Sequence, residues 1–313
     1  MIDIVVTYLY ERDKKWAQDF HYWKEKEILE HKAIKDNRQA FGVERTREWD
    51  TFKYWFRGIE QNCPWINKVF LIVQNENHIP KWIDRNNPKL RIVFHEEYIP
   101  KELLPTFNAM TICCYVSNIK DLSNNYIMSD DDFYFLNPIA EDRFFKDGKP
   151  IHLNNEINYE YFNDYMLNLS DGVFYSILNN DLEFSTNITG KRIKYGIYHL
   201  PEARLKNFEQ EIIHNNEQEF ENHFIGSKFR SRDNLCHTVF SDLLKKSNKV
   251  YWGNPYENCC YVALKSNLNF EDYWDKDIVC FNDTERLDDF NLTKQKLIEF
   301  LEKKFPNKSS YEV

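Results

Sequence analysis

The sequence lacks the features of a membrane-spanning, a disulfide-bonded or a nucleic-acid-binding protein. No run of about 18 apolar residues occurs among its 313 residues, so we expect no transmembrane helix. The first residues, Met1–Val6, show no basic segment before a long apolar run, and they indicate a strand instead of a signal peptide. The seven cysteines form no C-x-x-C pair and no zinc spacing, which favours reduced, buried thiols in the cytoplasm. A net charge of −9 argues against nucleic acid as the main partner.

Common catalytic signatures are absent as well. The chain has only 8 glycines, and neither phosphate-binding glycine pattern, G-x-x-x-x-G-K or G-x-G-x-x-G, occurs in it. The metalloprotease pattern H-E-x-x-H and the nucleophile pattern G-x-S-x-G are also missing. Carboxylates, histidines and arginines are therefore the candidates that remain for chemistry.

What is present is an alternation of apolar and amphipathic segments, with enough hydrophobic residues (42%) to bury a sizeable core. We expect one catalytic α/β domain over residues 1–313, built on a mixed, mainly parallel Rossmann/GT-A-like sheet flanked by helices, with 136–198 as an irregular α+β insertion or lid. The expected strands are 2–9, 68–73, 90–95, 126–128, 171–178 and 278–283. The expected helices are 11–30, 45–60, 109–119, 202–216 and 233–246, and the tail 303–313 is expected to fray.

One acidic run stands out because it interrupts apolar sequence. Asp130, Asp131 and Asp132 follow the apolar strand 126–128 and precede an aromatic run. Adjacent carboxylates repel one another, so one of them is protonated or a cation binds there. Mg²⁺ takes carboxylate and phosphate oxygens as ligands, and ligands of open α/β sheets bind at the carboxyl ends of strands. The plain alternative is a solvated acidic turn.

Three further groups are candidates, each with an ordinary structural alternative. Asn282 and Asp283 end a second apolar strand, so they could share a cation with the first acidic run or form a simple turn. His199 stands one residue before Leu200-Pro201 and suits general-base chemistry, although most histidines are only hydrogen-bonded. Arg230 precedes a helix and suits phosphate binding, or a surface salt bridge.

Four sequence blocks together resemble the Stealth family of sugar-phosphate transferases, which includes bacterial capsular polysaccharide phosphotransferases and the enzyme that adds GlcNAc-1-phosphate to lysosomal glycoproteins. The order and spacing of the blocks carry the resemblance over most of the chain. They are Ile2–Tyr8 with Asp13; Arg45–Pro138, with Arg45–Trp49, Tyr54–Glu60, Pro64–Ile66, Ile79–Trp82, Leu104–Asn108 and the acidic run; His199–Pro201 with Arg230; and Cys280–Asp283.

The resemblance implies roles for individual residues. The second block of the family ends in Asn-Asp-Asp, so Asp131 and Asp132 match its two acids, and Asp130 replaces its asparagine. It implies Asp132, His199 and Arg230 as catalytic residues, with Asp131 and Asp283 as metal ligands. Asp132 is at the metal or acts as the base, and His199 activates the hydroxyl or stabilises the phosphate. Tyr8 and Tyr10 depart from the family pattern. The residues it implies for donor binding are Asp3, Arg45, Arg47, Asn108 and Asn282.

The implied reaction is transfer of a hexose-1-phosphate, in particular a HexNAc-1-phosphate, from a UDP-sugar to a sugar hydroxyl. It forms a phosphodiester, releases UMP and uses Mg²⁺ or Mn²⁺. The implied acceptor is an oligosaccharide or a lipid-linked glycan of a capsule or exopolysaccharide, and the implied location is the cytoplasm, with peripheral association at the inner face of the cell membrane. Two alternatives stay open at this point: a metal-dependent GT-A-type glycosyltransferase that releases UDP, and a non-catalytic glycan-binding protein.

Overall fold

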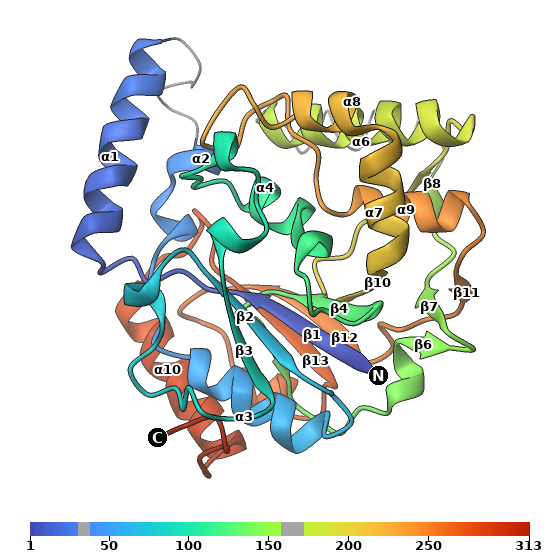
Figure 1. Ribbon diagram of the computed structural model, residues 1–313. Helices are drawn as coiled ribbons and strands as arrows, with labels where there is room; N and C mark the ends of the chain where they lie inside the picture. The colour runs from blue at the N-terminus through green and yellow to red at the C-terminus, as the bar shows by residue number, and fades with distance from the viewer. Residues whose placement is uncertain (31–37, 158–171) are drawn as a thin grey trace.

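A five-stranded sheet forms the centre of the computed structural model, which describes residues 1–30, 38–157 and 172–313 (Figure 1). Its strand order is β10-β4-β1-β2-β3. Four of the strands are parallel, and β10 runs antiparallel to β4 at one edge. This arrangement confirms the expected mixed, mainly parallel α/β sheet. The strands are β1 (Ile2–Thr7), β2 (Val69–Val73), β3 (Leu90–Phe94), β4 (Asn125–Ser129) and β10 (Glu202–Leu205).

A second sheet, of three strands in the order β12-β13-β5, lies beside the first. The chain passes from β4 of one sheet to β5 of the other through Asp130, Asp131 and Asp132 alone. The acidic run is therefore the junction between the two sheets. The strands of the second sheet and of two smaller ones are β5 (Phe133–Phe135), β6 (Phe145–Lys146), β7 (Lys149–His152), β8 (Glu156–Ile157), β9 (Lys194–Tyr195), β11 (Tyr251–Trp252), β12 (Cys259–Ala263) and β13 (Ile278–Asn282).

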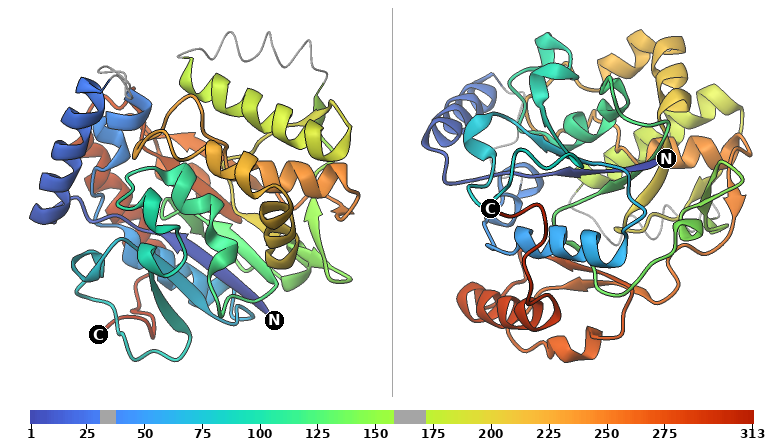
Figure 2. Two further views of the ribbon diagram at one scale, coloured as in Figure 1. Left: turned by 45° about the horizontal axis from the view of Figure 1, so that its top comes forward. Right: turned by 60° about the horizontal axis from the view of Figure 1, so that its bottom comes forward.

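Helices cover both faces of the central sheet (Figures 1 and 2). Of the helices in the described part of the chain, none is long and apolar enough to cross a membrane. They are α1 (Lys14–Leu29), α2 (Arg38–Phe41), α3 (Phe52–Asn62), α4 (Ala109–Cys114), α6 (Val173–Thr189), α7 (Lys206–Asn215), α8 (Glu217–Asn222), α9 (Val239–Lys246) and α10 (Phe290–Lys304).

The side chains of β1 point alternately to two hydrophobic cores, because successive residues of a strand face opposite sides of the sheet. Val5 packs into the core that α4, α6, α7 and α9 complete. Ile4 and Val6 pack into the other core, with Trp55 of α3 and residues of the second sheet. The apolar side of α10 covers the opposite face of that second sheet, below α3 in the right-hand view of Figure 2.

Four expected helices differ from those observed. The α-helix of the segment 109–119 ends at Cys114, and that of the segment 233–246 begins only at Val239. The segment 45–60 does not begin its helix until Phe52, because residues 45–51 form an irregular segment in which Asp50 has a positive φ of 57°. Of the segment 202–216, the first four residues form β10, which occupies the otherwise unpaired edge of β4. Backbone pairing with that edge outweighs the helical tendency of the sequence.

The insertion and the tail also differ in part from expectation. The strand expected at 171–178 is the start of α6, whose Ile177 packs into the main core; residue 171 lies outside the described residues. The tail does not fray: Tyr311 is buried, and Glu312 accepts hydrogen bonds from Arg57 of α3. A charged pair that is buried in this way holds the end of the chain on the fold.

Candidate active site

The acidic run forms a tight turn between the two sheets. The backbone N–H of Phe133 donates to the carbonyl oxygen of Asp130 at 3.3 Å, and the N–H of Phe281 on β13 donates to the carbonyl oxygen of Asp132 at 3.0 Å. The carboxylates of Asp130 and Asp132 are both about one-quarter exposed. The turn therefore lies at the carboxyl end of β4 and beside the carboxyl end of β13, as the position of the acids in the sequence predicts.

Burial and mutual repulsion disfavour the charged form of the carboxyl groups at this turn. Burial raises the pKa of Asp131 to about 7, with repulsion from Asp130 and Glu48 adding to the shift. Burial and the other two acids also raise the pKa of Asp132 well above its usual range. In the described part of the chain, no donor reaches Oδ1 of Asp132. Uncompensated carboxylate oxygens are the environment that a divalent cation stabilises.

His199 faces the acidic turn. Its Nε2 atom lies 3.9 Å from Oδ2 of Asp130 and 4.0 Å from Oδ2 of Asp132. The antiparallel pairing of Glu202 with Met128 explains this approach, because the chain that enters β10 passes the chain that leaves β4. The His199 ring is 46% exposed and packs edge-on against Phe133 at 5.0 Å. A histidine in this position can exchange a proton with a ligand at the turn.

Desolvation and charge keep this imidazole available as a base. Desolvation lowers the pKa of His199, and the carboxylate of Asp130 partly opposes this shift. The guanidinium groups of Arg45 and Arg230 lower the pKa further. The ring is therefore neutral near pH 7 and able to accept a proton.

Arg45 and Arg230 bring positive charge to the same place. Burial and the like charge of Arg45 lower the pKa of Arg230 to about 9, while Asp130 acts in the opposite direction. Two guanidinium groups that repel each other beside one carboxylate favour the binding of an anion with several oxygens, such as a diphosphate.

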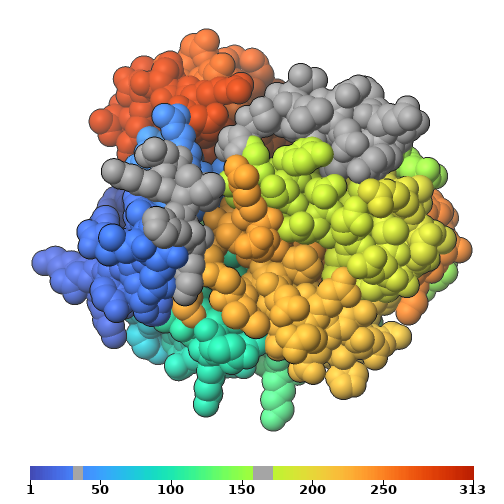
Figure 3. Space-filling model, turned by 90° about the horizontal axis from the view of Figure 1, so that it is seen from above, coloured from blue at the N-terminus to red at the C-terminus, as the bar shows by residue number. Residues whose placement is uncertain are grey.

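The loop that holds Arg230 is fixed by neighbours from distant parts of the chain. Glu27 of α1 accepts from the N–H of Lys228 at 2.6 Å and from the hydroxyl of Ser227 at 2.5 Å. Asn108 donates through Nδ2 to Oδ1 of Asn234 at 2.9 Å, at the other end of the loop. The segment around these residues (orange) lies between α1 and α6 when the molecule is seen from above (Figure 3).

Asn108 and Asp3 lie in positions that the fold itself explains. Asn108 is fully buried and caps α4 by accepting from the N–H of Met110 at 3.0 Å. Asp3 lies at the amino end of β1, opposite to the acidic turn, and accepts from Asn67 and from the N–H of Ser123, both at 2.7 Å. Asn108 thus supports the Arg230 loop, and Asp3 joins β1 to its neighbours. Their assignment to donor binding stays a prediction.

Asp283 is near the turn but is already bound by arginine. Arg47 donates from Nε to Oδ2 at 2.7 Å and from Nη2 to Oδ1 at 2.6 Å, and Trp49 donates from Nε1 to Oδ2 at 3.1 Å. These bonds also explain the late start of α3, because they draw residues 47–49 out of a helical path. A cation at Asp283 would share the carboxylate with Arg47.

Several side chains at the site were not predicted to take part. Tyr8 donates to Glu48 at 2.6 Å, and burial together with Glu48 raises the pKa of this tyrosine. The Cys280 thiol donates to Oδ2 of Asp132 at 3.6 Å. Tyr261 lies 5.9 Å from the His199 ring. Tyr8 and Cys280 lie in the first and fourth sequence blocks, whereas the position of Tyr261 depends on how distant strands pair.

Among the described residues, Asp132, His199 and Cys280 form a group of potential metal ligands, whose ligand atoms lie within 4.8 Å of one another. The predicted metal ligands Asp131 and Asp283 are not in this group. A protonated thiol is a poor ligand for Mg²⁺ or Mn²⁺, which prefer oxygen. Burial and the carboxylate of Asp132 raise the pKa of the Cys280 thiol well above its usual range, so it acts as a hydrogen-bond donor here.

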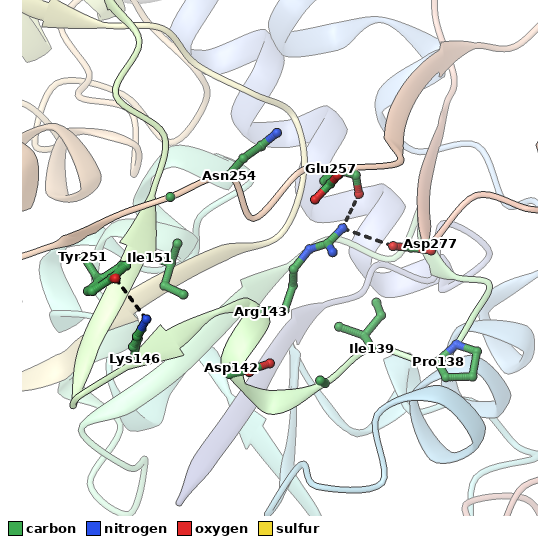
Figure 4. Close-up of a pocket in the computed structure, with 12 residues that line it drawn as sticks. Pro138, Ile139, Asp142, Arg143, Lys146, Ile151, Tyr251, Asn254, Glu257 and Asp277 are labelled. Carbon is green, nitrogen blue, oxygen red and sulfur yellow. Dashed lines mark hydrogen bonds and ion pairs between the residues drawn. The ribbon is translucent and has the colours of Figure 1, made fainter.

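A cavity in the described part of the chain lies away from this site. It has a volume of about 550 Å³ and is found near the amino end of β13, where Arg143 reaches Asp277 at 3.1 Å (Figure 4). Lys146 and Tyr251, which are hydrogen-bonded at 2.9 Å, form its other wall. The acidic turn, His199 and Arg230 do not line this cavity.

A parallel sheet with carboxylates, a histidine and arginines gathered at its carboxyl edge defines the class of this protein: an α/β enzyme with an ionic active site. Residues 45–152 match Stealth protein CR2, conserved region 2. The capsular polysaccharide phosphotransferase WcwK of Streptococcus pneumoniae is 31% identical over 349 residues, which cover 99% of this chain and 98% of WcwK. The chain belongs to the Stealth family.

Other relatives extend the comparison. The receptor polysaccharide phosphotransferase WefC of Streptococcus gordonii is 28% identical over 318 residues, covering 93% of this chain and 95% of WefC. The capsular polysaccharide phosphotransferase CpsJ of Streptococcus thermophilus is 36% identical over 149 residues, which cover 48% of this chain and 59% of CpsJ. The similarity therefore covers nearly the whole chain in some relatives and about half of it in others.

Proposed function

We propose that this protein is a sugar-phosphate transferase of polysaccharide synthesis that moves a hexose-1-phosphate, in particular a HexNAc-1-phosphate, from a UDP-sugar to a sugar hydroxyl. The names of the relatives support phosphotransfer to polysaccharides. The observation that supports this chemistry best is the meeting of His199, the acidic turn and two arginines within one site.

The proposed reaction needs a base, an anion site and a leaving group. The acceptor hydroxyl attacks the phosphorus atom next to the donor sugar while its proton passes to Nε2 of the neutral His199. A bond forms between the acceptor oxygen and phosphorus, and the bond from phosphorus to the bridging oxygen of UMP breaks. Arg230 and Arg45 offset the negative charge that gathers on the phosphate oxygens in the transition state.

Asp131 and Asp132 would hold Mg²⁺ or Mn²⁺, and the raised pKa of both groups supports a fit to a cation. Such a cation, when bound, neutralises diphosphate charge. We assign Asp283 to holding Arg47 at the edge of the site, since Arg47 and Trp49 occupy both of its oxygens. Asn282, next to Asp283, would contact the donor or the acceptor.

The proposed setting follows from the substrates. We place the reaction in the cytoplasm, where nucleotide sugars are made, with an oligosaccharide or lipid-linked glycan as acceptor at the inner face of the cell membrane. A capsule or cell-surface polysaccharide would be the product.

The decisive experiment is product analysis. Purified protein is incubated with a panel of UDP-sugars and acceptor oligosaccharides, with and without EDTA, and the nucleotide product is identified. The proposal expects UMP, lost on addition of EDTA. Release of UDP would identify a glycosyltransferase instead, and acceptor binding without turnover would identify a glycan-binding protein.

Variants then test the assigned residues. Asp132→Asn, His199→Ala and Arg230→Ala should each lower kcat at least 100-fold, the range expected for loss of a general base or of transition-state charge stabilisation. His214→Ala, a change at an exposed histidine on α7, is the matched control and should keep full activity. Near-normal turnover in a folded variant would reject the role of that residue.

A further inference from the structure

Two exposed tyrosines lie next to His199. Tyr198 precedes it in the chain and is 40% exposed, and Tyr261 on β12 is 48% exposed. Single exposed aromatic residues are common on protein surfaces. These two adjoin a proposed catalytic base, Tyr198 as its neighbour in the chain and Tyr261 through a ring contact at 5.9 Å.

Tyr261 is held in a fixed orientation. The strand register pairs it with Cys280, which in turn pairs with Phe133, so the three side chains form a row across the second sheet. The amide of Asn282 donates to the Tyr261 hydroxyl at 2.8 Å. The ring packs edge-on to His199, at 5.9 Å and 65°. Its hydroxyl is anchored and nearly half of the residue faces solvent.

Tyr198 is supported from the other side. Its ring packs on that of Tyr256 at 5.0 Å and 33°, and the buried Leu200 two residues later anchors the segment. Tyr256 itself packs against the core beneath the second sheet. Both tyrosines are thus rigid surfaces, which bind a ligand at a lower cost in conformational entropy than flexible side chains do.

We propose that Tyr198 and Tyr261, here called the tyrosine platform, bind a pyranose ring of the acceptor glycan and direct its hydroxyl to His199. This inference depends on the proposed function. A pyranose has an apolar C–H face that suits the face of an aromatic ring, and its hydroxyl groups suit nearby polar atoms such as the Asn282 amide. The charged side of His199, toward Asp130 and Arg230, suits the donor diphosphate. The platform, whose surface is the faces and edges of two tyrosine rings, suits a sugar.

The test separates binding of the acceptor from binding of the donor. Tyr198→Ala and Tyr261→Ala are compared with Tyr22→Ala, a change at a 59% exposed tyrosine on α1. The acceptor is an oligosaccharide prepared from the polysaccharide of the source organism. Each platform variant should raise the acceptor KM about tenfold and leave the UDP-sugar KM unchanged, and Tyr22→Ala should change neither.

A conservative variant distinguishes the ring from its hydroxyl. Tyr261→Phe keeps the stacking surface and should hold the acceptor KM within about threefold of wild type, since it loses one hydrogen bond. An unchanged acceptor KM in both alanine variants would overturn the platform. A rise in the UDP-sugar KM alone would also overturn it, because the rings would then serve the donor.

Direct binding separates this inference from the proposed function. Calorimetric titration of the same oligosaccharide into His199→Ala, with and without the platform substitutions, measures binding without turnover. If wild type releases no UMP but oligosaccharide binding depends on the tyrosines, the proposed function fails and the platform stands. If UMP is released and binding does not depend on them, the platform fails alone.

Discussion

Lowering the pH from 8 to 6 should weaken divalent-cation binding at the acidic turn by about tenfold. With its pKa raised to about 7, Asp131 is roughly nine-tenths protonated at pH 6 and one-tenth protonated at pH 8. A proton and a cation compete for the same oxygens, so the apparent dissociation constant scales with one plus the ratio of protonated to ionised carboxylate. That factor is about 11 at pH 6 and about 1.1 at pH 8. Asp132, whose pKa is also raised, adds to the effect.

The raised pKa of Asp131 also determines whether the free energy of unfolding rises or falls with pH. Because the pKa of Asp131 is above its ordinary value of 3.8, the folded protein binds more protons than the unfolded chain between about pH 4 and pH 7. The free energy of unfolding of the metal-free protein should therefore fall as pH rises through this window. Mg²⁺ or Mn²⁺ at 100 times its dissociation constant should restore about 2.7 kcal/mol at pH 8, or about 5 °C in Tm.

Titration calorimetry with MnCl₂ at both pH values, paired with thermal unfolding, measures these quantities. Asp131→Asn should weaken binding and reduce its pH dependence, and Asp147→Asn, at an exposed acid in the β6–β7 turn, is the matched control. Equal affinity at pH 6 and pH 8, or no binding at either, would refute the assignment of a cation to this turn.

Two further predictions concern stability. Glu312→Ala leaves the buried guanidinium of Arg57 without its bidentate partner and should cost about 3 to 5 kcal/mol in chemical unfolding. The control Glu302→Gln removes an exposed charge 3.8 Å from Arg57 but keeps an acceptor for the Tyr54 hydroxyl, and should cost less than about 1 kcal/mol. Equal costs would contradict the argument. Burial lowers the pKa of His152 to about 3, so this histidine binds a proton in the unfolded chain at a higher pH than in the folded protein, and the free energy of unfolding should fall as pH drops below about 6.5. In acid-unfolding curves, His152→Gln should lessen that fall. An identical pH profile would show that this histidine does not contribute.

Local patterns in the sequence predicted most of the central sheet. The apolar strands at 2–9, 68–73 and 90–95 are all present, with bounds that differ by a residue or two. Their prediction succeeds because a strand buried on both faces needs a continuous apolar run. The elements nearer the C-terminus could not be predicted from local sequence in the same way. β10 is a strand because β4 offers it an edge. The C-terminal tail is ordered by contacts with distant residues, which include the burial of Tyr311, the bonds from Arg57 to Glu312 and the backbone bond from Val313 to Trp82.

Some residues of the candidate site could also be predicted from local sequence, and others could not. The acidic run and His199 were candidates from the sequence because of the residues that flank them, and the family resemblance implied a role for each. Asp3 and Asn108, which the resemblance implies for donor binding, both accept hydrogen bonds from backbone N–H groups in the structure. A buried polar residue has the same appearance in sequence whether it binds a ligand or its own backbone. Tyr261 had no local signal, whereas Tyr8 and Glu48 lie in the first and second sequence blocks.

The sequence by itself determined which groups this protein can use: three adjacent carboxylates after an apolar strand, one histidine before a proline, and arginines in two separate blocks. Only the tertiary structure decided which of them meet. The pairing of β10 with β4 brings His199 to the acidic turn. The pairing of β13 with β5 brings Asn282 and Asp283 beside the same turn, where Arg47 binds the carboxylate of Asp283. Contacts between residues far apart in the chain depend on strand order and register, and no local stretch of sequence encodes those.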